Sequence, residues 1–215
     1  MIIEFKNIFF SHPPSEHGDG SGKEVFSAFS LSVQRGAKLI VKGRSGGGKT
    51  TLLRLMAWLV EPDRGEILFN GKPYASYNPP FLRRKISLVA QTPVMLEGSV
   101  RHNLSLGLET APPDKILHEW LEKFALETPV LNQSARSLSV GQQQRVAVIR
   151  NLLLKPSVIL LDEPTSGLDP ESAEIFREAM MKISETSGLT VVWNSHNVEK
   201  VKSIATDIVT IGEPA

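Results

Sequence analysis

The chain contains short apolar runs rich in Ile, Val, Leu and Phe, with the length that is typical of β-strands. We predict strands over residues 2–5, 25–33, 37–41, 66–69, 86–90, 158–161, 190–193 and 207–211. The runs 158–161 and 190–193 are apolar without polar alternation, which is typical of strands that helices cover on both faces. The pattern therefore predicts a parallel α/β core.

Helical periodicity appears between several of these runs. We predict helices over residues 49–59, 113–124, 141–154, 170–184 and 197–204. No strand is predicted in the middle of the chain, and a structureless loop of that length would be unusual inside a domain. We therefore expect one domain in which a helical subdomain, about residues 92–154, is inserted into a core of about residues 1–91 and 155–215. Residues 11–23, rich in Pro, Gly and Ser, predict a surface loop.

Composition narrows the class of protein. A chain of 215 residues fits one domain, and 24 Lys plus Arg nearly balance 23 Asp plus Glu without a basic arm, so we expect no nucleic-acid partner. No apolar stretch reaches the ~18 to 20 residues of a membrane span, and the start of the chain lacks the features of a secretory signal. The absence of cysteine excludes disulfides and cysteine-ligated metals. Together these features favour the cytoplasm.

A glycine-rich segment carries the clearest chemical signal. The sequence GRSGGGKT matches G-x-x-x-x-G-K-[ST] and lies between a predicted strand and a predicted helix, which is the context that a phosphate loop needs. We expect Lys49 to bridge the β- and γ-phosphates of a nucleotide and Thr50 to ligate Mg²⁺, while backbone N–H groups bind the phosphates. The predicted nucleotide-binding residues of this segment are Gly43, Arg44, Ser45, Gly46, Gly47, Gly48, Lys49, Thr50 and Thr51. The alternative, a glycine-rich turn that ends in Lys-Thr by chance, does not account for the flanking strand and helix.

Two carboxylates follow the apolar run 158–161, at the end of a strand where open α/β sheets bind their ligands. We predict that Asp162 holds Mg²⁺ through its water shell and that Glu163 polarises an attacking water as a general base. The alternative is a strand that simply ends in acidic turn residues. His196 follows the run 190–193, where its imidazole could contact a γ-phosphate or have a structural role.

The sequence LSVGQQQR at residues 138–145 resembles the LSGGQ signature of ABC ATPases. At this predicted helix start, Ser139 and the backbone of Gly141 can donate hydrogen bonds to a phosphate, and Gln142 completes the motif. In the ABC family that phosphate belongs to the nucleotide bound by the opposing subunit. An ordinary serine-capped helix is the alternative.

The resemblance extends over nearly the whole chain, from residue 2 to about residue 211. Gln91 lies where the family has its Q-loop glutamine, which senses Mg²⁺ and the attacking water, and His196 lies at the position of the switch histidine. Asp169 resembles the end of the D-loop, which crosses the dimer interface, although it could equally cap the next helix. The resemblance implies a P-loop NTPase with a RecA-like core, an N-terminal antiparallel β region and a helical subdomain. It also implies a head-to-tail dimer around two ATP molecules with Mg²⁺.

Three positions depart from the family pattern. Val140 replaces the first glycine of the signature, and we expect an altered rate rather than lost activity. The place where the family stacks an aromatic ring on adenine falls on His12, with Phe9 or Phe10 as alternatives. An asparagine, Asn197, follows the switch histidine where an acidic residue is common.

The segment 91–104 resembles the exporter form of this region in ABC proteins, in which Q-x-P is followed by G-[ST]-[IV] and N-[IL]. Residues 132–137 lack the glycine-containing stretch of fused exporters. These resemblances imply a stand-alone subunit at the inner face of the cell membrane that pairs with a second copy and with a separate permease. Segments 90–93 and 124–126 are similar to the ATP-binding subunit of a bacterial iron-export system.

Three other classes stay open at this point. A soluble, non-transport ABC ATPase of the assembly-scaffold type would share every motif. A small P-loop kinase would have no use for a signature helix that completes the site of another subunit. A binding-only partner in a heterodimer is the third class, and the presence of Glu163 and His196 argues against it.

Overall fold

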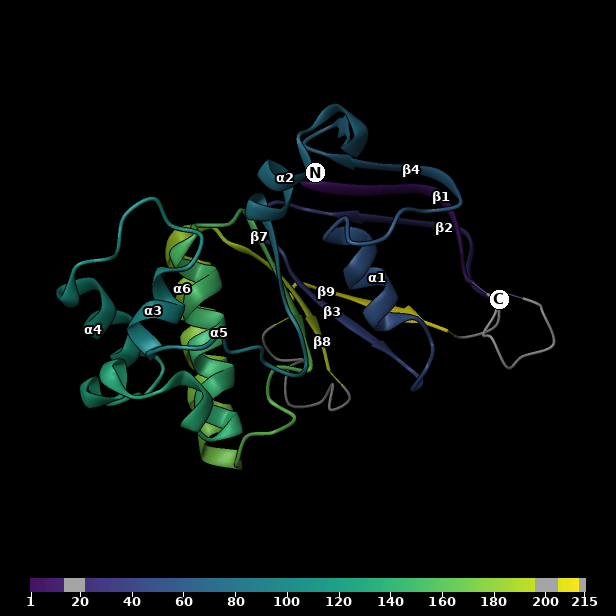
Figure 1. The fold of residues 1–215 in the computed structure, drawn as a ribbon. Coiled ribbons are helices and arrows are strands. Elements are labelled where there is room, and N and C mark those ends of the chain that lie inside the picture. The colour runs from purple at the N-terminus through teal and green to yellow at the C-terminus, as the bar shows by residue number, and fades with distance from the viewer. Residues whose placement is uncertain (14–21, 196–204, 213–215) are drawn as a thin grey trace.

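The computed structural model describes residues 1–13, 22–195 and 205–212 of the chain. Its strands form one antiparallel and one parallel sheet (Figure 1). The antiparallel sheet has the order β2-β1-β4-β5 and consists of β1 (Ile3–His12), β2 (Lys23–Val33), β4 (Arg64–Phe69) and β5 (Lys72–Pro73). This sheet is the antiparallel β region that the family resemblance implied.

The second sheet is parallel throughout and has the order β6-β7-β8-β3-β9. Its strands are β3 (Lys38–Gly43), β6 (Ile86–Val89), β7 (Val158–Asp162), β8 (Thr190–Asn194) and β9 (Asp207–Ile211). Side chains of β7 alternate between two hydrophobic clusters, with Ile159 and Leu161 in one and Val158 and Leu160 in the other. Because both faces of this strand are buried, its sequence has no polar alternation. The prediction of a parallel core covered on both faces is confirmed.

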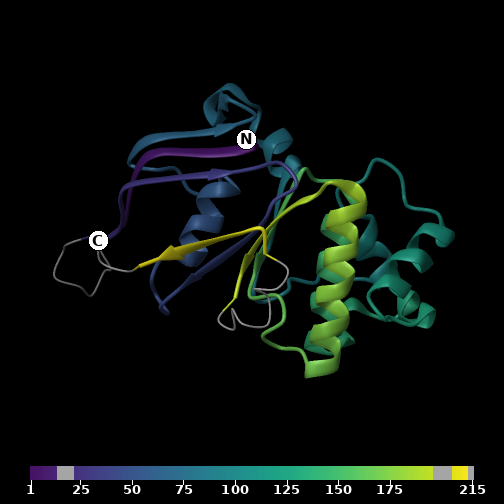
Figure 2. The same ribbon diagram turned by 180° about the vertical axis from the view of Figure 1, so that it is seen from behind.

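Helices cover the two faces of the parallel sheet. Figure 1 shows α1 (Lys49–Met56) between the two sheets, and Figure 2 shows α6 (Pro170–Ser187) along the opposite face. Residues of α5 (Val140–Leu153) pack in the same hydrophobic cluster as α6. The remaining helices are α2 (Pro79–Lys85), α3 (Val100–Ser105), α4 (Asp114–Lys123) and the 3-10 helices Tyr74–Ser76, Thr128–Asn132 and Ala135–Ser137. The helices α3, α4 and α5 follow β6 in the chain and precede β7.

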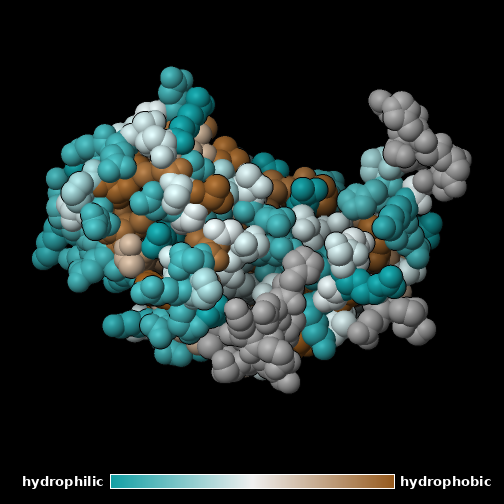
Figure 3. All heavy atoms as spheres, turned by 90° about the horizontal axis from the view of Figure 1, so that it is seen from below, coloured by the Kyte–Doolittle hydropathy of each residue, from teal (hydrophilic) through white to brown (hydrophobic). Residues whose placement is uncertain are grey.

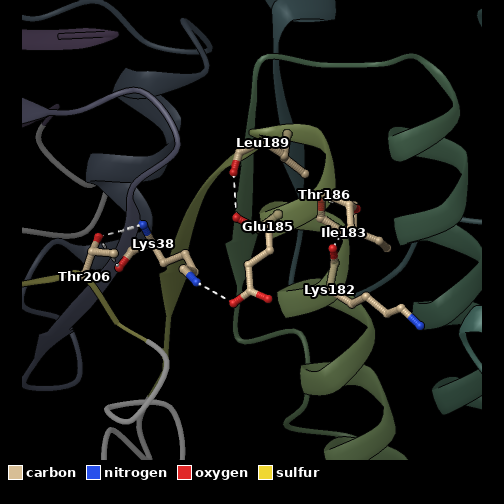
Figure 4. Close-up of polar contacts among 8 residues, drawn as sticks. Lys38, Lys182, Ile183, Glu185, Thr186, Leu189 and Thr206 are labelled. Atoms are coloured by element: carbon tan, nitrogen blue, oxygen red, sulfur yellow. Dashed lines mark hydrogen bonds and ion pairs between the residues drawn. The ribbon is translucent and has the colours of Figure 1, made fainter.

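An ion pair joins α6 to the start of β3. Figure 4 shows the ammonium of Lys38 pointing to the carboxylate of Glu185, at 3.1 Å. The backbone N–H of Lys38 also donates to the hydroxyl of Thr206, at 2.9 Å, just before β9. The start of β3 is therefore joined to a helix and to a neighbouring strand, while its end is left for the phosphate loop.

The structure differs from the predicted elements in several places. Residues 11–23 were expected to be a loop, but β1 continues to His12 and β2 begins at Lys23, and these two residues pair in the sheet. Backbone pairing extends this hairpin through polar residues that do not show the apolar pattern of a strand. The helices α2 and α3 and the two-residue strand β5 were not predicted, because they are too short to show a periodicity. The predicted helix 197–204 lies outside the described residues.

Asn103 organises the turn that follows β6. Its side chain is fully buried (0% exposed); its amide N–H groups donate to the carbonyls of Leu96 (2.9 Å) and Ser99 (3.1 Å), and its Oδ1 accepts from the N–H of Leu96 (2.9 Å). Arg150, on α5, donates to the carbonyl of Val94 at 3.0 Å. One buried amide and one arginine therefore hold the segment between β6 and α3.

We expect Asn103→Ala to lower the free energy of unfolding by about 2 kcal/mol, because it leaves buried backbone groups without partners. Urea unfolding followed by circular dichroism measures this change. Asn132→Ala is the matched control, since Asn132 is exposed at the end of a 3-10 helix and should change stability little. Equal stability of the Asn103→Ala protein and the wild type would contradict this account.

Candidate nucleotide-binding site

The predicted phosphate loop joins the end of β3 to the start of α1. Three of its glycines, Gly43, Gly46 and Gly48, have a positive φ that strains any other residue, and at two of them an added Cβ would also meet a neighbouring atom. Gly43 has φ 151°, and a Cβ there would lie 2.1 Å from the carbonyl oxygen of Ile211; Gly48, the N-cap of α1, has φ 97°, and a Cβ there would lie 2.5 Å from Val25. The loop therefore curves tightly and directs the N-terminus of α1 at the space that it encloses.

Lys49 lies at the centre of this curve. Its side chain is 5% exposed, and its ammonium donates to the carbonyls of Gly43 and Arg44, both at 2.9 Å. A buried ammonium needs such partners to offset its loss of hydration. The loop thus holds a positive charge in place where a phosphate would bind.

Thr50 and Asp162 come together from different elements. The hydroxyl of Thr50, in the first turn of α1, donates to Oδ2 of Asp162 at the end of β7, at 2.9 Å. Hydroxyl and carboxylate oxygens are hard donors of the kind that Mg²⁺ binds, beside the phosphates of a nucleotide. The two residues therefore fit a magnesium ion.

Glu163 and Gln91 form a second pair. The side-chain amide of Gln91, which follows β6, donates to Oε2 of Glu163 at 3.2 Å. The backbone of Glu163 has φ 48°, a left-handed conformation that is uncommon for a residue with a side chain. Its N–H donates to the carbonyl of Asn194 at 3.0 Å. Strain of this kind is found at functional sites, where surrounding structure maintains it.

One cavity of about 380 Å³ joins these groups. It is lined by His12, Lys23, Val25, Ser45, Gly46, Gly48, Lys49, Thr50, Thr51, Gln91, Glu163 and Asn194. The structure thus brings the phosphate loop, Gln91 and Glu163 together around one cavity. Asp162 is hydrogen-bonded to Thr50, which lines that cavity. Lys23, Val25 and Asn194 were not predicted from the sequence, because strand pairing places them there and no local motif marks them.

Three residues, His12, Phe9 and Phe10, were predicted as candidates to stack on adenine. Of these, the structure places His12 at the cavity. Its Nε2 lies 3.1 Å from the hydroxyl of Thr51, and its ring packs perpendicular to the ring of Phe10, with ring centres 5.2 Å apart. Phe10 is buried in the core, and the guanidinium of Arg64 lies over the ring of Phe9. Neither phenylalanine is among the residues that line the cavity.

The signature residues lie elsewhere on the chain. Ser139 caps α5: its hydroxyl accepts from the N–H of Gln142 at 3.2 Å, and its own N–H donates to the Gln142 side chain at 3.0 Å. Val140 is 61% exposed. A Cβ on Gly141 would lie 2.8 Å from Leu168, so this helix start packs closely on the segment before α6.

Asp169 also acts as a cap. Its Oδ1 accepts from the N–H of Ser172 at 2.9 Å, and this backbone hydrogen bond lowers the pKa of the carboxyl below its ordinary value. None of Ser139, Gly141, Gln142 and Asp169 lines the cavity at the phosphate loop of its own chain. His196 lies outside the described residues.

A strand, phosphate loop and helix, with a carboxylate at the end of β7 hydrogen-bonded to the loop threonine, define a P-loop NTPase fold. Residues 26–166, more than half of the chain, match the ABC transporter family. The chain therefore belongs to the ABC transporter family, and it is an ATP-binding and ATP-hydrolysing cassette of that family.

Two relatives and one solved structure illustrate the similarity. YjkB, an ABC transporter ATP-binding protein of Bacillus subtilis, is 39% identical over 96% of this chain and 81% of its own length. STAR1 of Oryza sativa is 38% identical over 89% of this chain, which spans 56% of that protein. The ATP-binding cassette MJ0796, solved as a post-hydrolysis dimer with ADP and Pi, superposes with a TM-score of 0.85 at 27% identity, covering 98% of this chain and 94% of that one.

We expect Lys49→Ala to weaken ATP binding by at least about tenfold, because a hydrogen bond to a charged group contributes about 1.5 to 3 kcal/mol. Titration with a fluorescent ATP analogue measures the affinity, and a thermal melt shows whether the variant is still folded. Lys42→Ala is the control, because Lys42 lies on β3 and is not among the residues that line the cavity. Wild-type affinity in the Lys49→Ala protein would refute the assigned role.

Proposed function

We propose that this chain is the ATP-binding subunit of a transporter, and that it hydrolyses Mg-ATP in a head-to-tail dimer to drive a separate membrane permease. The observation that carries the hydrolytic part is the convergence of Lys49, the Thr50–Asp162 pair and the Gln91–Glu163 pair on one cavity. Each pair joins segments far apart in the sequence, so their meeting depends on the fold.

Each residue has one role in the proposed reaction. Lys49 and the N–H groups of the loop bind the β- and γ-phosphates, with Gly43, Arg44, Ser45, Gly46, Gly47, Gly48 and Thr51 forming the rest of the loop. Thr50 and Asp162 hold Mg²⁺, which neutralises charge on the phosphate oxygens when it is bound.

Glu163 accepts the proton of the attacking water as that water adds to the γ-phosphorus and ADP leaves. Gln91 donates a hydrogen bond to this carboxylate and fixes its direction. Gln91 is also proposed to be a residue of the magnesium site. His196 is proposed to contact the γ-phosphate, and His12 to stack on adenine.

A second subunit is proposed to complete the site. Ser139, Gly141 and Gln142 lie at an exposed helix start outside the cavity of their own chain, so they are available to a nucleotide bound by another copy. Asp169 directly follows Leu168, the residue that lies close to Gly141 at this helix start. The similar cassette MJ0796 is described as a dimer, which supports this arrangement.

The transport role rests on the family and on the segment after β6. This segment exposes the large apolar side chains of Val94 and Leu96, and Figure 3 shows hydrophobic surface on the side of the molecule that carries α3, α4 and α5. Such a surface suits a helix of a permease. No helix in the described part of the chain is long and apolar enough to cross a bilayer. We propose a peripheral position at the cytoplasmic face, and export, with a metal such as iron as the cargo.

We expect Glu163→Gln to bind Mg-ATP with nearly normal affinity and to lower turnover by at least about 100-fold, since it removes a general base. In gel filtration, Mg-ATP should move this variant from monomer to dimer, and ADP should not. The wild-type rate should rise faster than linearly with protein concentration, because two copies form the site.

Two controls accompany this measurement. Glu178→Gln changes an exposed carboxylate on α6 and should leave turnover unchanged. Lys49→Ala combined with Glu163→Gln should stay monomeric, since it binds ATP poorly. Normal turnover in the Glu163→Gln protein would overturn the assignment of the base. A variant that binds ATP and stays monomeric would overturn the composite site.

A further inference from the structure

Asn194 is a polar residue in a position that is otherwise apolar. It ends β8, a strand in which three consecutive apolar residues precede it, and its side chain is 1% exposed. The sheet register sets it opposite Asp162, and its Nδ2 donates to Oδ1 of Asp162 at 2.5 Å. Its carbonyl oxygen accepts from the N–H of Glu163. Asn194 thus contacts both acidic residues of the site.

The two oxygens of Asp162 are divided between two donors. Oδ1 accepts from Asn194, and Oδ2 accepts from the hydroxyl of Thr50. A carboxylate without the first bond could rotate about its Cβ–Cγ bond and turn its plane away from Thr50. The amide of Asn194 therefore holds the orientation of the Asp162 carboxylate in which one oxygen faces Thr50.

The other end of the same amide has no partner. Because Nδ2 donates to Asp162, the amide orientation is determined, and Oδ1 of Asn194 is a buried acceptor with no hydrogen bond in the described part of the structure. Asn194 lines the cavity that contains Lys49, Thr50 and Glu163. Buried acceptors are nearly always paired in folded proteins, so this acceptor, on a residue that lines the cavity, calls for a donor that the described residues do not supply.

We propose that Asn194 is a positioning residue for the magnesium site, an inference that rests on the proposed function. Its N–H holds the Asp162 carboxylate in the orientation in which Oδ2 meets the Thr50 hydroxyl, the pair that would hold the cation, and its Oδ1 is the acceptor that would bind a water of the hydrated ion. Hydrated Mg²⁺ keeps several waters, which donate strongly, and an amide oxygen is a suitable acceptor for one of them.

The test measures how strongly Mg²⁺ assists nucleotide binding. A fluorescent, non-hydrolysable ATP analogue is titrated into the protein with Mg²⁺ and again with EDTA. The dissociation constant in EDTA divided by that in Mg²⁺ gives the contribution of the metal. We expect Asn194→Leu, which keeps the approximate shape of the side chain, to lower this ratio by about tenfold or more. Its dissociation constant in EDTA should match that of the wild type.

Thr190→Val is the matched control. Thr190 is also buried on β8, at the opposite end of the strand, and its hydroxyl accepts from the N–H of Gly36 at 2.9 Å. This variant loses a buried hydrogen bond of the same strand without touching the site, so its ratio should equal the wild-type ratio. Asn194→Ser, which is polar but too short to maintain both contacts, provides a second test if the leucine variant does not fold.

The outcomes separate this inference from the proposed function. A high ratio in the wild type and a lowered ratio in Asn194→Leu or Asn194→Ser supports the positioning role. A high ratio that both variants retain overturns it and leaves the ATPase site intact. A wild-type ratio of one would overturn the magnesium site of the proposed function, and this inference with it.

Discussion

The parallel direction of β3, β7 and β8 determines where the functional side chains of this chain come together. The carboxyl ends of parallel strands meet at one edge of a sheet, so the phosphate loop after β3, Asp162 on β7 and Asn194 on β8 face the same space. The hydrogen bond from Thr50 to Asp162 crosses over β8, which lies between β3 and β7. If β8 ran the other way, Asn194 would lie at the opposite edge and Asp162 would lose one of its two donors.

Burial of the sheet on both faces explains why these polar groups are so closely held. A hydrophobic cluster covers each face of the parallel sheet, and the polar side chains of the site lie where the strands end. A buried charge is tolerated when hydrogen bonds replace its water. Lys49 has two carbonyl partners, and Asp162 has two side-chain donors. The partners of Lys49 belong to the phosphate loop itself, whereas those of Asp162 come from α1 and β8, so hydrogen bonds hold both charged groups at defined places, which is the condition for electrostatic preorganisation.

The sequence could predict those parts of the site that local patterns encode. The phosphate loop needs a strand, glycines and a helix in succession, and Asp162 and Glu163 directly follow an apolar strand. Asn194 could not be predicted in this way, because its partner lies on another strand and only the register brings them together. The same limit applies to Lys23, which reaches the cavity through pairing with His12. Short elements such as α2 and α3 were missed because they contain too few residues to show a period.

The alternative that Ser139 is only a helix cap is compatible with a role in binding a phosphate. A serine hydroxyl can accept one hydrogen bond and still donate its own proton. In this structure Ser139 accepts from the N–H of Gln142, which fixes its rotamer at the helix start. Gly141 lies in the first turn of the same helix, where an added Cβ would lie 2.8 Å from the side chain of Leu168. The cap therefore prepares the hydroxyl and the helix N-terminus for an anion, and the structural and functional interpretations describe the same geometry.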